Sequence, residues 1–305
     1  MKSVSFNQDV KALVPTSGVF PKFLTYSLLG RTDELLKLVS TAGNSAGVLD
    51  TKIVQSLEIW LPPLAEQRVI AETLSDVDEL LAALDALIAK KRAVKRGAVQ
   101  QLLSGETRLP GFSGGWTNRR LTDLVKLPTG QVNPLHEPFR SLVLIAPDHI
   151  ESRTGRLLDK LTAGDQGAIS GKYRFSPGDV IYSKIRPYLR KAHLAVFDGL
   201  CSADMYPLTP MANVSGAFLH SILLDNRFSA FAEAVSARSG IPKVNRSELA
   251  EFWLPLPSLR EQQSIAEVLT DMDAEIEALK RRWEKTRQIK QGMMQELLTG
   301  RTRLV

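Results

Sequence analysis

The sequence LAEQRVIAETLSDVD at residues 64–78 returns almost unchanged as LREQQSIAEVLTDMD at residues 259–273, at an offset of 195 residues. With that offset, 22 of the 46 positions from Leu64 to Leu109 are identical in the second copy, and no gap is needed. An internal repeat of this length indicates that the chain is built from copies of one structural unit.

The repeat extends upstream at the same offset. FLTYSLL at residues 23–29 faces FLHSILL at residues 218–224. Residues from about 6 to 109 therefore repeat as about 201 to 304, whereas residues 110–200 have no counterpart in the sequence. The chain looks like one whole unit preceded by only the second half of another.

Each copy contains a long helix, predicted over about 66–103 and 261–298, because its apolar residues recur at spacings of three and four. This heptad pattern is typical of a coiled coil. Ser258 begins a capping box, and Gly105 and Gly300 are expected to end the helices. The candidate positions for the helix pair and for partner contacts are Ile70, Leu74, Val77, Leu81, Leu84, Ile88, Ile265, Leu269, Met272, Ile276, Leu279 and Trp283.

The charge along each predicted helix changes sign. The first half is rich in Glu and Asp, and the second half is rich in Lys and Arg. Opposite charges face each other only if the two helices pair antiparallel, which would place two globular units at opposite ends of a rod. The alternative is that each helix packs on its own unit and that the charges are simply solvated.

The remaining segments predict a mixed architecture. Residues 174–185, RFSPGDVIYSKI, indicate a turn and then a strand, and residues 251–257 indicate another strand. Residues 216–236 have helical spacing, and residues 117–130 indicate a short helix or turn and a loop. The predicted fold class is α+β or mixed α/β, with globular units joined by two long helices. The predicted parts are an incomplete first unit (1–63), a first long helix (64–104), a linker (105–116), a complete second unit (117–257) and a second long helix (258–305).

The charge and the cysteine content restrict the possible partners. The net charge of +6 over 305 residues fits nucleic acid as a partner, although a solvated basic surface fits equally well. Cys201 is the only cysteine, which excludes an intrachain disulfide and favours the cytoplasm. The N-terminus has no apolar segment of the kind that secretory signals carry, and no apolar run reaches the roughly 18 residues of a membrane helix.

No enzymatic motif is present. The chain lacks a phosphate-binding glycine loop, a dinucleotide fingerprint and the acidic cluster of many nucleases. The four histidines are scattered without zinc-ligand spacing, and Cys201 has the surroundings of a structural thiol. We therefore predict no catalytic residue and no metal site.

Positive charge is concentrated in the segment without a repeat partner. From Lys172 to His193 the only acid is Asp179, and three tyrosines are interleaved. Cations neutralise phosphates, and planar side chains contact bases or sugars. The alternative is that Tyr182 and part of its strand are core. The candidate DNA-binding residues are Lys172, Arg174, Lys184, Arg186, Tyr188, Arg190 and Lys191, with Arg238, Lys243 and Arg246 in a second basic loop.

These segments resemble a known family. LPPLAEQRVIAETLSDVD at residues 61–78, its repeat, and GDVIYSKIRP at residues 178–187 are similar to segments of the DNA-specificity subunit of type I restriction–modification enzymes. The resemblance implies a non-catalytic subunit with two target-recognition domains, each reading half of a bipartite site in double-stranded DNA. It also implies that the helices form the spacer between half-sites and dock methyltransferase subunits, with a restriction subunit joining the complex. S-adenosylmethionine, ATP and Mg would be bound by those partners and not by this chain.

The sequence departs from the family pattern in one respect. The family begins with a full first recognition domain, whereas here the counterpart of residues 110–195 is missing. We consider a truncated product, a deliberately shortened subunit, and a subunit that completes its first unit by self-association. The competing functions are a coiled-coil scaffold that binds only proteins, and a nuclease or methyltransferase, which the missing motifs disfavour. The sequence does not indicate which DNA site is recognised.

Overall fold

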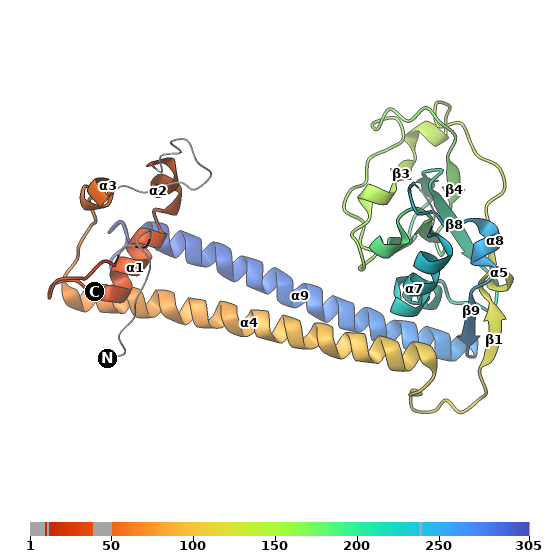
Figure 1. The fold of residues 1–305 in the computed structure, drawn as a ribbon, viewed down its shortest axis with the longest axis horizontal. Coiled ribbons are helices and arrows are strands. Elements are labelled where there is room, and N and C mark those ends of the chain that lie inside the picture. The colour runs from red at the N-terminus through yellow and green to blue at the C-terminus, as the bar shows by residue number, and fades with distance from the viewer. Residues whose placement is uncertain (1–9, 11, 39–50, 238–239, 305) are drawn as a thin grey trace. The chain divides into compact units, whose positions relative to one another are not determined.

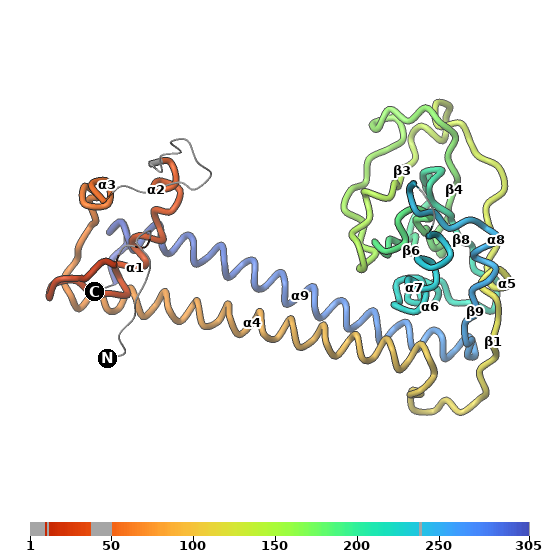
Figure 2. Tube along the Cα trace, viewed as in Figure 1, coloured from red at the N-terminus to blue at the C-terminus, as the bar shows by residue number. Residues whose placement is uncertain are grey.

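The structure, a computed structural model, divides the chain into two compact units (Figures 1 and 2). It describes residues 10, 12–38, 51–237 and 240–304. Unit 1 consists of residues 1–91 and 275–305, and unit 2 consists of residues 92–274. Each unit therefore contains parts of both repeats.

Two long helices contribute to both units, and they match the sequence prediction closely. They are α4 (Leu64–Ser104) and α9 (Leu259–Leu297). Ser258 accepts a hydrogen bond on its Oγ from the backbone N–H of Glu261, which is one of the two bonds of the predicted capping box, whereas the Glu261 carboxylate binds Arg108 and Trp116 instead. Gly105 follows α4 with a φ of 77°, the left-handed conformation in which glycine commonly ends a helix.

Within each unit, α4 and α9 run antiparallel, so the order predicted from their charges is present. As residue numbers rise along α4, those of the ion-paired residues in α9 fall. Exposed pairs of this kind contribute about 0–1 kcal/mol each, so they favour the antiparallel orientation but add little to the stability of the fold. The pairs are Asp78–Lys290 and Lys91–Glu275 in unit 1, and Lys95–Asp273 in unit 2.

The predicted apolar seam is buried to different degrees along its length. Near the helix ends, seam residues join the cores of the globular parts as well as the helix pair: Ile70 and Leu74 pack with Phe23, and Ile265 and Leu269 belong to the core of unit 2. The buried seam residues are Ile70, Leu74, Leu84, Ile88, Ile265, Leu269 and Ile276. The half-buried ones are Val77, Leu81, Met272, Leu279 and Trp283.

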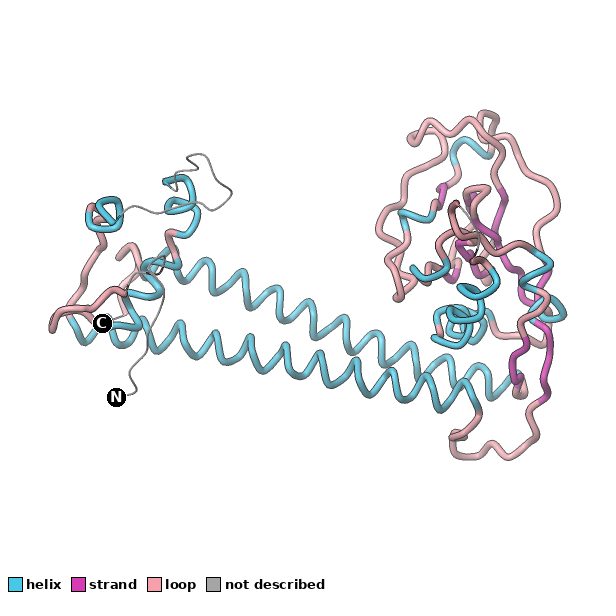
Figure 3. The backbone as a smooth tube through the Cα atoms, viewed as in Figure 1, coloured by secondary structure: helices cyan, strands magenta, loops and turns pink. Residues whose placement is uncertain are grey.

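Unit 2 contains the strands (Figure 3). A four-stranded sheet in the order β2-β8-β5-β6 packs against α6, a three-stranded sheet has the order β3-β7-β4, and β1 pairs with β9. All pairs are antiparallel except β3 with β7. The strands are β1 (Thr117–Arg120), β2 (Val125–Lys126), β3 (Val143–Ile145), β4 (Tyr173–Phe175), β5 (Val180–Ser183), β6 (Ala192–Leu194), β7 (Gly199–Cys201), β8 (Met205–Pro210) and β9 (Trp253–Leu256). The helices are α5 (Leu121–Leu124), α6 (Gly216–Leu224), α7 (Asn226–Val235) and α8 (Arg246–Leu249), with short 3-10 turns η1 (Phe139–Ser141), η2 (Pro147–His149) and η3 (Pro187–Leu189).

The predictions for unit 2 hold with two differences. The turn and strand expected in residues 174–185 are present as β5, and the strand expected in residues 251–257 is β9. The helix predicted over residues 216–236 is divided into α6 and α7 because Asp225 is extended and its side chain caps α7. Residues 117–130 contain an unexpected strand, β1, whose sequence TNRR has no apolar alternation.

Unit 1 repeats three of the short helices of unit 2 but has no strand among its described residues. Its helices are α1 (Pro21–Leu29), α2 (Thr32–Leu38) and α3 (Thr51–Gln55), with the first part of α4 and the last part of α9. At the offset of 195 residues these correspond to α6, α7 and α8. The core is small and contains Phe23, Tyr26, Ile70, Ala71, Leu74, Leu297 and Leu298.

Candidate nucleic-acid interface

The candidate site begins where β5 ends. Lys184 is the first residue after β5, and its side chain is buried, with the residue only 8% exposed. Its Nζ lies 5.0 Å from the centroid of the Tyr206 ring in β8. In the antiparallel register of β5 and β8, Tyr206 pairs with Tyr182. Lys184 comes two residues after Tyr182, so its side chain lies on the same face of the sheet as Tyr206. The face of an aromatic ring attracts a cation in this position.

The second basic loop of the sequence lies against the same end of β5. The backbone N–H of Val244 donates to the carbonyl oxygen of Lys184 over 2.8 Å. The backbone N–H of Arg186 donates to the carbonyl oxygen of Pro242 over 2.9 Å. Two basic segments that are distant in sequence therefore form one surface.

This surface adds two more cations near Lys184. Lys243 is exposed and stands opposite Ile185 in a backbone bridge. The guanidinium carbon of Arg246 lies 5.8 Å from the centroid of the Tyr206 ring. One N–H of Arg246 donates to the carbonyl oxygen of Pro128, which fixes the guanidinium group in place. Lys184, Lys243 and Arg246 with Tyr206 are called the β5 cation cluster below.

The charges of the β5 cation cluster act on one another. Burial lowers the pKa of Lys184, and the positive charges of Lys243 and Arg246 lower it further, while Asp204 acts in the opposite direction. Burial also raises the pKa of the Tyr206 hydroxyl, against the effect of Arg246. Positive charge is thus concentrated where it is partly removed from water, an arrangement that an anion would stabilise.

Three arginines beside this cluster have left-handed backbone conformations. Arg186 and Arg190 flank η3 with φ values of 50° and 49°, and Arg153 has a φ of 68°. Arg153 donates its backbone N–H to the carbonyl oxygen of Arg190 over 3.1 Å. Such conformations cost of order 1–3 kcal/mol in non-glycine residues and gather at functional sites. Tyr188 in η3 is 45% exposed, so it is available for stacking.

The structure argues against a DNA contact by two of the predicted residues. Lys172 is 7% exposed, and its Nζ donates to the backbone carbonyl and the Oγ of Ser170, each over 2.7 Å. Lys191 donates its Nζ to the carbonyl oxygen of Pro147 over 2.6 Å. Both ammonium groups satisfy internal acceptors, which explains their position better than a surface role.

The other predicted residues lie in three kinds of place. Arg174 is exposed, with its guanidinium carbon 5.9 Å from the Phe139 ring centroid. Tyr182 is in the core, as the alternative interpretation stated, and burial raises the pKa of its hydroxyl. Arg238 lies outside the described residues.

Sequence reasoning missed Tyr206 and Arg153. Tyr206 lies in the apolar segment MYPLTP, where only the pairing of β5 with β8 reveals its position beside Lys184. Arg153 lies in a loop, and no pattern in the sequence indicates a positive φ at a residue other than glycine.

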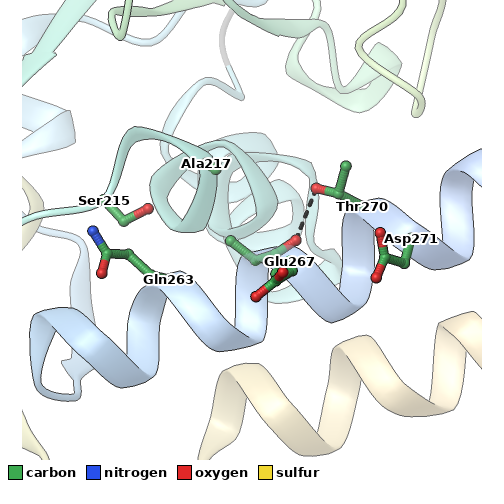
Figure 4. A pocket seen from close by; sticks show the side chains of 7 residues that line it. Ser215, Ala217, Gln263, Glu267, Thr270 and Asp271 are labelled. Carbon is green, nitrogen blue, oxygen red and sulfur yellow. Dashed lines mark hydrogen bonds between the residues drawn. The ribbon is translucent and has the colours of Figure 1, made fainter.

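Other surface features of the described residues carry no comparable site. A pocket of about 290 Å³ beside α9 is lined by Ser215, Gln263, Glu267, Thr270 and Asp271, among others, and its carboxylates do not suit a nucleic acid (Figure 4). Among the described residues, no group of three or more His, Cys, Asp or Glu side chains could hold a metal ion. In the same part of the chain, no helix is long and apolar enough to span a membrane.

The fold defines a class of protein: a chain of mixed α+β structure that contains two long helices. The model of one family, described as "Type I restriction modification DNA specificity domain", matches residues 1–91 and 153–287. The chain belongs to this family.

Two relatives support the assignment. The chain is 30% identical over 278 residues to the type I restriction enzyme EcoDI specificity subunit of Escherichia coli, covering 80% of this chain and 61% of that protein. It is 24% identical over 302 residues to the MjaVIII specificity subunit of Methanocaldococcus jannaschii, covering 92% of this chain and 70% of that protein. The chain thus spans under two thirds of the length of its E. coli relative.

Solved structures show the same fold at lower identity. The S subunit of a type I restriction–modification system from M. genitalium matches with a TM-score of 0.60 and 17% identity, covering 91% of this chain and 72% of that one. The HsdS subunit of Thermoanaerobacter tengcongensis matches with a TM-score of 0.51 and 20% identity, covering 93% and 71%.

Proposed function

We propose that this chain is a DNA-specificity subunit whose unit 2 reads part of a target in double-stranded DNA. The observation that carries the proposal is the convergence of two basic segments at the end of β5, where Lys184 and Arg246 lie against the Tyr206 ring and the loop of Lys243 pairs with the residue after Lys184. Cations supply affinity for the phosphate backbone, and the adjacent Arg186 and Tyr188 supply side chains that can reach bases.

We also propose that α4 and α9 act as the spacer between half-sites and as the dock for methyltransferase subunits. The antiparallel ion pairs within each unit support the first role. Exposed apolar residues of α4 in unit 1 support the second: Leu80 and Leu87 are seven residues apart and both exposed. Exposed apolar residues in regular heptad positions are typical of a helix that packs against another protein.

The remaining partners follow from this assignment. A restriction subunit would join the assembly, and the complex would act on DNA in the cytoplasm. S-adenosylmethionine, ATP and Mg would be bound by the partner subunits, where methyl transfer and cleavage would take place. The present chain would supply recognition and assembly and no catalytic group.

The test is DNA binding by the assembled complex. The chain is co-purified with its methyltransferase subunits, and its affinity for a pool of random duplexes is measured from 50 to 200 mM salt, with selection and sequencing of the bound fraction. We expect affinity to fall steeply with salt and the bound fraction to be enriched in one sequence. A complex that assembles but shows no sequence preference contradicts recognition and favours the protein-binding scaffold.

Arg186→Ala provides the matched variant for base reading. Arg186 is exposed and adopts a left-handed conformation, so alanine leaves the strain of the backbone in place while removing the guanidinium group. We expect its loss to relax the selected sequence at one position, since a bidentate base contact discriminates by about 1–3 kcal/mol. An unchanged selected sequence with unchanged affinity would remove Arg186 from the interface.

A further inference from the structure

We infer that the β5 cation cluster is a clamp for a single phosphodiester group of the DNA backbone, with the Tyr206 ring as one wall. The inference rests on the proposed function and deepens it, because it assigns a particular chemical group of the DNA to particular side chains. Lys184, Lys243 and Arg246 would contact the phosphate oxygens.

The first argument is a comparison of the two buried lysines of unit 2. Lys172 and Lys184 are 7% and 8% exposed, and burial lowers the pKa of both. The ammonium group of Lys172 is satisfied by two acceptors on Ser170. Among the described residues, no hydrogen bond of the Lys184 ammonium group is formed, and its charge lies against the Tyr206 ring and near Lys243, Arg246 and the carboxylate of Asp204. An ammonium group that has no hydrogen bond within the protein and lies near two further cations would be stabilised by an anionic ligand.

The second argument is that the backbone beside Lys243 and the guanidinium group of Arg246 are held in place before any ligand binds. The backbone N–H of Val244, next to Lys243, bonds to the carbonyl oxygen of Lys184, and Arg246 is fixed by the carbonyl oxygen of Pro128. That bond uses one of the five donors of the guanidinium group. Prepositioned donors that lose little freedom on binding favour a small, highly charged group.

The third argument distinguishes a phosphate from a base. Bases are read by planar, bidentate contacts, most often from arginine or asparagine. Here two of the three cations are lysines, whose ammonium groups act as point charges and suit the oxygens of a phosphate. A phosphate contact carries no sequence information, so the clamp would fix the position of unit 2 on the duplex while residues such as Arg186 read bases.

The experiment compares Lys184→Met with Lys172→Met in the complex with methyltransferase subunits. Methionine keeps a buried apolar stem and removes the charge, so the two variants differ only in which ammonium group is lost. Duplex affinity is measured as a function of salt for the selected target and for a scrambled duplex. Lys243→Gln, at an exposed position, is a second clamp variant that carries little risk to folding.

For Lys184→Met we expect roughly ten-fold weaker binding to both duplexes, and a slope of log affinity against log salt that is smaller by about 1, as for one lost phosphate contact. Lys243→Gln should reduce the slope in the same direction, and Lys172→Met should leave it unchanged.

Each of the following four results would contradict the clamp. An unchanged slope with Lys184→Met and Lys243→Gln shows that no phosphate is held there. A changed sequence preference with an unchanged slope assigns the cluster to base reading. Loss of methyltransferase binding with normal DNA affinity assigns it to a carboxylate of the partner protein. If the unaltered complex itself shows no salt-dependent binding, the proposed function fails together with the clamp.

Discussion

The two units close the ends of the long helices with similar contacts, although in unit 2 the tryptophan also donates its indole N–H to the glutamate. In unit 1, Arg303 donates two hydrogen bonds of 2.6 Å to the buried carboxylate of Glu66, and its guanidinium carbon lies 5.5 Å from the Trp60 ring centroid. Gly300, with a φ of 74°, makes the turn that brings Arg303 back to the start of α4.

Unit 2 repeats this arrangement with Arg108 on Glu261 and on Trp116, whose ring centroid is 5.4 Å from the guanidinium carbon. The Glu, Arg and Gly of the two sites are related by the offset of 195 residues, but the tryptophans are not. Trp60 corresponds to Pro255, and Trp116 lies outside the repeat.

The difference teaches how the duplication is used. In each unit the glutamate comes from the start of one long helix and the arginine from the tail of the other, so neither repeat can close a unit alone. The aromatic wall is supplied from a different part of the chain in each case. The glutamate, the arginine and the glycine are the same in both units, whereas the tryptophan comes from a different position in each.

The largest expected effect distinguishes the two cores. Leu74 and Leu269 are equivalent and both buried, and each Leu→Ala change should cost about 2–5 kcal/mol. The core of unit 1 is much the smaller, so Leu74→Ala should remove hydrogen-exchange protection from α1, whereas Leu269→Ala should weaken but retain it in α6. Equal loss of protection in α1 and α6 for both variants would show that the units unfold as one.

The next effect tests whether the units are anchored equally. Gln67 accepts a hydrogen bond from the backbone N–H of Phe20 and donates to the carbonyls of Gly18 and Pro62. Gln262 makes the same three bonds at equivalent positions, to Ser215, Asn213 and Pro257.

Because these groups are buried, Gln67→Ala and Gln262→Ala should each cost about 1–3 kcal/mol. The measurement is the free energy of opening of each unit by hydrogen exchange. Gln263→Ala, one residue along on the exposed face, is the control and should change little. A markedly smaller cost for Gln67 than for Gln262 would break the equivalence of the two anchors.

A smaller effect distinguishes the two glycines. Both have positive φ, so alanine should cost about 1 kcal/mol at either position from the backbone alone. A Cβ at Gly300 would lie 2.5 Å from the Trp60 ring, whereas at Gly105 it would lie 3.2 Å from Trp116. Gly300→Ala should therefore destabilise unit 1 more than Gly105→Ala destabilises unit 2, as measured by urea denaturation. The reverse order would mean that Trp60 moves aside more easily than its packing indicates.

Sequence patterns predicted several elements well because their periodicity is local. The long helices, β5 and β9 all follow from residue spacing along one segment. The β5 cation cluster was predicted only in part, since Lys184, Lys243 and Arg246 were named but Tyr206, whose ring lies against Lys184 and Arg246, was not. Strand register brings Tyr206 to that point, and the sequence does not determine register. Burial also separates Lys172 from Lys184, two lysines that the sequence presents alike.

The smallest expected effect concerns acid. The hydrogen bonds from Arg303 hold the pKa of Glu66 below its usual value of 4.5, despite the opposing effect of burial. A carboxylate whose pKa is lowered on folding stabilises the folded state fully above the unfolded pKa, and this stabilisation is lost as the pH falls through the folded pKa. Unit 1 should therefore lose stability as the pH falls below about 4.5. In the variant Glu66→Gln, whose side chain is neutral at every pH, this part of the loss should be absent.

The comparison of these two proteins at each pH isolates Glu66, because other acidic groups such as Asp78 titrate in both. Their difference in the free energy of opening of unit 1, measured by hydrogen exchange, should be constant near neutral pH and shrink in acid. A difference that stays constant down to pH 3 would show that Arg303 and Glu66 do not interact in solution. It would also mean that the tail of α9 is held by the Trp60 contact alone, so that the two units close by different means.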